Sequence, residues 1–162
     1  METRFIPRDL RALDGLSADL LACPFWSDVR PMRGLAGLID WRLSGKIGEL
    51  LRRRFITGEA GELLLVPIGW SGPIDKLIVF GAGERAHFDK NAFMQALGSV
   101  AHAMRNLKVR SVVIELPGRA DHLVEVDTAL EWSRQCADSG QANPTWSIVE
   151  DERWLSQEMR RR

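Results

Sequence analysis

The alternation of apolar and polar positions along the chain predicts short buried strands interleaved with helices. Four runs are almost entirely apolar, as expected for strands covered on both faces: DLLACPF at 19–25, ELLLVP at 62–67, KLIVF at 76–80 and VRSVVIEL at 109–116. Weaker strands are expected at 3–6 and 146–149, and three- and four-residue spacing predicts helices at 35–54, 89–107 and 127–137. This order predicts an α/β fold, a three-layer α/β/α sandwich with a mixed, largely parallel sheet.

The longest predicted helix, residues 35–54, carries two distinct tracks. One is a wide apolar stripe, and the other consists of the small residues Gly37, Ser44, Gly45 and Gly48. Each glycine costs a helix about 1 kcal/mol relative to alanine. We therefore expect another backbone to pack very close to the small-residue track. Trp41 lies on this track and is expected to fill a gap in the core.

Length and charge set the broad class of protein. A chain of 162 residues is about one domain, which we place at residues 1–150, followed by a charged helical tail at 151–162. The 22 basic and 22 acidic side chains give zero net charge, which argues against binding to nucleic acid or membrane surfaces. The N-terminus lacks an apolar signal segment, and no apolar run approaches the ~20 residues of a membrane span. The expected location is cytoplasmic.

Candidate catalytic and metal-binding residues are sparse. The two cysteines have no neighbouring ligand, and His87, His102 and His122 lack metal-ligand spacing. His102 is expected to be a partly buried structural histidine. Glu115 interrupts an apolar strand, which an edge or an exposed sheet face would explain. We therefore predict no catalytic residue, metal or cofactor.

A glycine motif follows the strand at 76–80. Residues 81–86 read GAGERA and formally fit the dinucleotide pattern G-x-G-x-x-[GA]. In a dinucleotide site the helix begins within the motif, whereas here Asp89 is the expected N-cap. The motif therefore indicates a glycine-rich strand exit. Trp26 and Trp70 fall in loops, where either could be an exposed contact.

The glycine punctuation carries a family resemblance. A helix with Ile39-Asp40 and Gly45 leads to Phe55, Gly58, Gly61 and Glu62, and then to Gly81-Ala82-Gly83. Over roughly residues 19–118 this pattern resembles the N-terminal domain of the leucyl (cytosol) aminopeptidase family. The resemblance implies a macro-domain-like fold. In that family the peptidase activity belongs to a separate C-terminal domain with two metal ions around an N-T-D-A-E-G-R segment, and nothing here matches that segment.

The resemblance implies a function by binding. The first hypothesis is a stand-alone, non-catalytic domain that binds another protein or itself, since in family enzymes the domain accompanies a hexameric core. The alternative is a macro-domain-like binder or hydrolase of ADP-ribose or a related nucleotide. Its cleft would lie at Trp26, Arg33, Gly34, Gly81 and Gly83, although the asparagines and glycine triplet of macro domains are missing. A weaker alternative is DNA binding through basic residues of the long helix, namely Arg42, Lys46, Arg52, Arg53 and Arg54.

Overall fold

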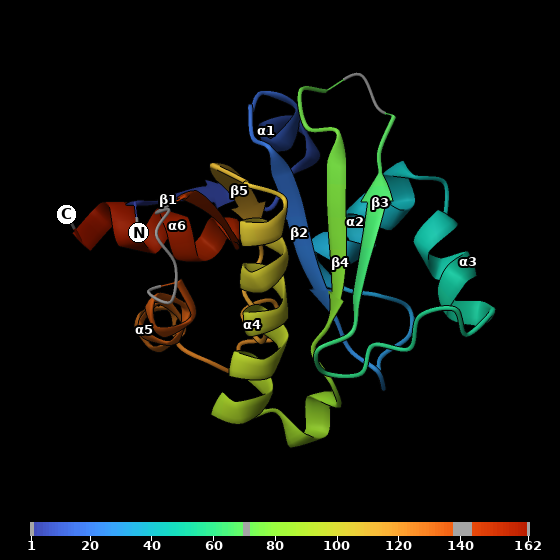
Figure 1. Cartoon of the computed structure of the whole chain (residues 1–162). Helices are drawn as coiled ribbons and strands as arrows, with labels where there is room; N and C mark the ends of the chain where they lie inside the picture. The colour runs from blue at the N-terminus through green and yellow to red at the C-terminus, as the bar shows by residue number, and fades with distance from the viewer. Residues whose placement is uncertain (1, 70–71, 138–143, 162) are drawn as a thin grey trace.

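A six-stranded sheet forms the centre of the molecule (Figure 1). The computed structural model describes residues 2–69, 72–137 and 144–161. The strands in chain order are β1 (Glu2–Pro7), β2 (Leu20–Phe25), β3 (Leu63–Pro67), β4 (Lys76–Gly81), β5 (Ser111–Ile114) and β6 (Thr145–Glu150). Their order across the sheet is β1-β6-β5-β2-β4-β3, and only β3 is antiparallel to its neighbour. The predicted mixed, largely parallel sheet is confirmed.

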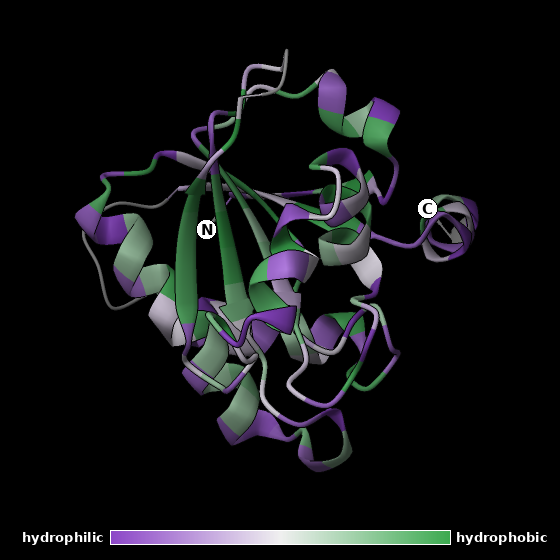
Figure 2. Cartoon of the chain, turned by 90° about the vertical axis from the view of Figure 1, so that its right-hand side faces the viewer, coloured by the Kyte–Doolittle hydropathy of each residue, from purple (hydrophilic) through white to green (hydrophobic). Residues whose placement is uncertain are grey.

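Helices cover both faces of this sheet. One face packs against α1 (Leu10–Asp14), α2 (Gly34–Arg42) and α3 (Lys46–Arg52), and the other against α4 (Lys90–Asn106), α5 (Val126–Ala137) and α6 (Glu152–Arg161). Successive strand side chains alternate between the two faces, so Leu20 and Leu21 belong to different apolar clusters. Figure 2 shows the apolar strands between the two layers of helices. The three-layer α/β/α sandwich is confirmed.

The single helix predicted at 35–54 is wrong. The structure has two helices, α2 and α3, separated by Ser44 and Gly45 in the left-handed backbone region, with φ of 57° and 77°. Asp40 stabilises the break, because its Oδ1 accepts hydrogen bonds from the N–H groups of Ile47 (2.9 Å) and Gly48 (3.0 Å). These are N–H groups that the first turn of a helix leaves without a partner.

The small-residue track therefore serves more than one purpose. Gly45 has open space around it and provides the left-handed turn, whereas a Cβ on Gly37 would lie 2.6 Å from the Met32 carbonyl oxygen. Trp41 is 76% exposed and does not fill the core. The buried face of α2 is set by Leu35, Ala36 and Ile39, and Trp41 lies about 200° around the helix from Ile39.

The segment after β4 matches the predicted strand exit. A 3-10 turn, η1 (Arg85–His87), intervenes before α4 begins at Lys90. The Asp89 side chain caps α4 by accepting a 2.8 Å hydrogen bond from the Ala92 N–H, as predicted. His102 is exposed, which corrects the prediction of partial burial, because the buried face of α4 passes through Val100, Ala101 and Met104.

Candidate functional site

Polar side chains gather where the parallel strands end. Strand β5 pairs in parallel with β2 on one side and with β6 on the other. The carboxyl ends of all three strands therefore lie at one edge of the sheet. Trp26, Glu115 and Glu150 stand at these ends. In open α/β sheets this edge is the usual ligand position, and it is the candidate site in this protein.

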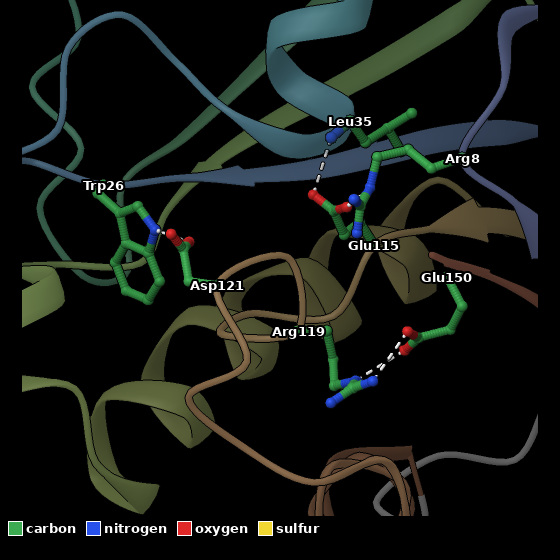
Figure 3. Close-up of polar contacts among 7 residues, drawn as sticks. All are labelled: Arg8, Trp26, Leu35, Glu115, Arg119, Asp121 and Glu150. Carbon is green, nitrogen blue, oxygen red and sulfur yellow. Dashed lines mark hydrogen bonds and ion pairs between the residues drawn. The ribbon is translucent and has the colours of Figure 1, made fainter. Parts of the chain in front are cut away.

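Glu115 is buried at the centre of the site, with 1% of its surface exposed. Its Oε1 lies 2.6 Å from Arg8 Nε, and its Oε2 accepts a 2.9 Å hydrogen bond from the Leu35 N–H at the start of α2 (Figure 3). The predicted edge or exposed position is wrong, because β5 lies between β2 and β6 in the sheet interior. Burial raises the pKa of Glu115, and the attraction of Arg8 and the Leu35 hydrogen bond oppose that rise.

A second buried ion pair lies beside the first. Arg119 donates from Nε and Nη2 to the two carboxylate oxygens of Glu150, at 2.8 and 2.9 Å, and its Nη1 donates to the Val124 carbonyl. Arg119 is 4% exposed and Glu150 1%. Because the pairing is bidentate and buried, it fixes the loop after β5 to the end of β6.

Trp26 anchors the other side of the same loop. Its indole Nε1 donates to Asp121 Oδ2 at 2.7 Å (Figure 3). Arg85 Nε lies 3.0 Å from Asp121 Oδ1. Asp28 accepts a 2.8 Å hydrogen bond from the Arg85 N–H, and this bond lowers the pKa of Asp28. Trp26 is only 7% exposed, so the suggestion of an exposed contact is wrong for it. Trp70 lies outside the described residues.

The cleft residues suggested by the sequence fall in two places. Trp26 and Arg33 line a pocket with Glu115 and Asp121, and its volume is only about 10 Å³. Gly34 adjoins this pocket, where the Glu115 carboxylate occupies the space that a Cβ would need. Gly81 and Gly83 instead pack against the turn at residues 58–60, and the Gly83 N–H donates to the Gly58 carbonyl at 2.9 Å.

Known proteins share both the sequence pattern and the fold. Residues 28–135 match the model of the cytosol aminopeptidase family, N-terminal domain. The chain belongs to the cytosol aminopeptidase family. A probable cytosol aminopeptidase of Synechocystis sp. is 31% identical over 101 residues, which are 62% of this chain and 20% of the relative. A probable cytosol aminopeptidase of Aquifex aeolicus is 26% identical over 131 residues, which are 80% of this chain and 25% of the relative. The chain thus spans about a fifth to a quarter of these relatives.

Solved structures of macrodomains and of an aminopeptidase share the fold of this N-terminal domain. The macrodomain of Mycobacterium tuberculosis DarG superposes with a TM-score of 0.72 at 13% identity, covering 93% of this chain and 98% of that one. A mutant of tomato leucine aminopeptidase superposes with a TM-score of 0.65 at 11% identity, covering 99% of this chain and 35% of that one. At these identities the likeness shows the fold alone.

Sequence reasoning missed most of the polar residues at this edge of the aminopeptidase domain. The sequence predicts an edge or exposed position for Glu115, and it does not identify Arg8, Arg119, Asp121 or Glu150 as site residues. One signal was available, because β5 and β6 each lead from an apolar run directly into a glutamate, VVIE and SIVE. A carboxylate at the end of a buried parallel strand requires a cation or N–H groups, which the sequence cannot place.

The basic residues suggested for DNA binding are largely paired. Arg42 pairs with Asp14, and Arg52 and Arg53 both pair with Glu49. In the described ranges no group of three or more His, Cys, Asp or Glu residues could hold a metal ion. No described helix combines the length and apolar character needed to cross a bilayer.

Proposed function

We propose that this aminopeptidase N-terminal domain acts by binding protein, another copy of itself included, and that the chain has no catalytic activity of its own. The observation that favours this proposal over nucleotide binding is the position of Glu115. Its carboxylate accepts the N–H of Leu35 at the start of α2 and pairs with Arg8. These are the groups that a phosphate would use at a helix N-terminus.

The space at this edge also argues against a nucleotide. A pocket of about 10 Å³ has room for about one water molecule, whereas small-molecule sites usually measure about 300–1,000 Å³. The loop after β5 is held at two neighbouring points, by Arg119 with Glu150 and by Asp121 with Trp26. Opening the site would break these contacts. The negative charge of the Glu115 carboxylate at the start of α2 would also repel an incoming phosphate.

Calorimetry of the 162-residue chain with ADP-ribose tests the absence of a nucleotide site. We expect no binding heat from the wild type. A saturable one-to-one isotherm would overturn the proposal and favour the macro-domain-like alternative. The Arg53→Met variant is the matched control for any isotherm, because Arg53 follows α3 directly, is exposed and pairs with Glu49 and not with a residue of the site. Binding at the cleft should not depend on it.

Peptidase assays test the absence of catalysis. The purified chain should not hydrolyse leucine p-nitroanilide with added zinc or manganese. Activity that co-purifies with the chain through several columns, and survives controls for contaminating host peptidases, would contradict the proposal. DNA binding is checked by measuring the affinity of the same preparation for DNA at several salt concentrations. Any affinity through residues 52–54 should fall steeply with added salt.

A further inference from the structure

Strand β1 leaves one edge of the sheet open. Among the described residues it pairs only with β6. The Arg8 N–H just after β1 donates to the Glu150 carbonyl at 2.9 Å, and alternate residues of a strand direct their backbone groups to the same side. The even-numbered residues of β1 therefore face β6, and Thr3 and Phe5 direct their N–H and C=O groups outward. Such an edge is a template for another strand.

A groove runs beside this edge, between β1 and α6. It measures about 670 Å³ and is lined on the strand side by Thr3, Phe5 and Pro7. The rings of Phe5 and Trp154 pack with centroids 4.9 Å apart, which holds α6 against β1. Met159, near the end of α6, also lines the groove and is 74% exposed. Figure 1 shows α6 running back along β1, so that the start of β1 and the end of α6 lie on the same side.

The exposed charges of β1 are complementary to those of a second, antiparallel copy of β1. Glu2 and Arg4 are both exposed and lie on the same face, two residues apart. Arg4 is held by a 2.6 Å hydrogen bond from its Nε to Ser147 Oγ. If two copies of β1 pair antiparallel about Thr3, each Glu2 lies opposite the Arg4 of the other copy. The two Thr3 residues then exchange both backbone hydrogen bonds, and Pro7, which lacks an N–H, lies beyond the paired segment.

We propose that β1 is a self-pairing edge through which two copies of this domain form a two-fold dimer with a continuous sheet. The proposal rests on the self-assembly part of the proposed function. The two-fold axis is perpendicular to the sheet, so both α6 helices lie on the same face, with Met159 at the end of the groove where the copies meet. The strand that pairs with β1 is a second copy of β1. A strand of another protein would have to present a basic and an acidic side chain two residues apart, opposite Glu2 and Arg4, in antiparallel orientation.

Charge reversal tests the register, with sedimentation velocity of the full chain over a wide range of protein concentration. We expect a reversible monomer–dimer equilibrium for the wild type. Glu2→Arg and Arg4→Glu should each raise the dimer Kd by about tenfold or more, because each creates two like-charge pairs across the axis. The double variant should restore the wild-type Kd. Glu131→Arg, an exposed reversal on α5, is the matched control and should leave the Kd unchanged.

Thr3→Pro gives an independent test of the backbone pairing. It removes an outward N–H and leaves the hydrogen bonds to β6 intact, so the variant should fold, as checked by circular dichroism, and remain monomeric.

A wild type that stays monomeric at all concentrations would overturn the β1 dimer. So would a dimer that the single reversals do not weaken, or that the double variant does not restore; in that case self-assembly through another surface would survive. Binding of ADP-ribose by the wild type would count against the proposed function and leave the β1 dimer standing.

Discussion

The Glu115 carboxylate accepts a 2.9 Å hydrogen bond from the backbone N–H of Leu35, a residue 80 positions earlier in the chain. The start of α2 carries partial positive charge, which a carboxylate stabilises. Since the other carboxylate oxygen pairs with Arg8, one side chain joins the end of β5, the start of α2 and the segment after β1. Glu115 thereby closes the sheet edge that other α/β proteins leave open for ligands.

Removing this carboxylate should destabilise the fold. Glu115→Ala leaves Arg8, whose side chain is 17% exposed, and the Leu35 N–H without their partner. We expect a loss of about 2–3 kcal/mol in the free energy of unfolding, somewhat less than for a fully buried pair. Urea unfolding followed by tryptophan fluorescence measures it. Glu131→Ala on the exposed face of α5 is the control, and a similarly small effect for both variants would contradict this role of Glu115.

The same residue should give stability an unusual pH dependence. Burial, and to a lesser extent the charge of Glu150, raise the pKa of Glu115 above its ordinary 4.5, against the opposing effect of Arg8. Between 4.5 and the raised pKa the native state holds a proton that the unfolded chain has released. The contribution of Glu115 to the free energy of unfolding therefore falls as the pH rises through this window.

Comparison with Glu115→Gln isolates that contribution. Wild-type stability should decline relative to the variant as the pH rises from 4.5, which urea midpoints measured at several pH values would detect. The lowered pKa values of Asp14 and Asp28 act in the opposite sense, because their contributions are lost only as the pH falls below 3.8, so the two windows do not overlap. A difference between the two proteins that is flat, or that grows with pH in favour of the wild type, would show that the pKa of Glu115 is not raised.

The sequence predicted the layers of this fold better than its site. The continuous apolar run of β2 and the helical periodicity of α4 identify their buried surfaces, because burial selects residue types there directly. The break between α2 and α3 depends on Asp40, which stabilises it through hydrogen bonds that no periodicity encodes. The site depends on pairs such as Arg119 with Glu150, 31 positions apart, whose partners only the folded topology brings together.

Two glycines should respond oppositely to alanine. A Cβ on Gly81 would lie 2.7 Å from the Gly58 carbonyl oxygen and closer still to that of Glu59, whereas a Cβ on Gly98 would meet nothing within 4 Å. Gly81→Ala should cost at least about 2 kcal/mol by overpacking. Gly98→Ala, in the interior of α4, should stabilise by about 0.5–1 kcal/mol. Thermal unfolding compares them, and a tolerated Gly81→Ala would mean that the turn at 58–60 is not packed against β4.

The Arg119–Glu150 pair should contribute far more to stability than an ion pair at the surface. Arg119→Met leaves the Glu150 carboxylate buried at 1% exposure without a cation, and we expect a loss of about 3–5 kcal/mol. Arg53→Met removes an exposed pairing with Glu49, where water replaces the lost partner, and should leave the unfolding midpoint unchanged. Because Arg119 also donates to the Val124 carbonyl, its loss should loosen residues 117–124 and speed amide hydrogen exchange there. Equal midpoints for the two variants, or unchanged exchange in this loop, would show that the pair does not hold the site closed.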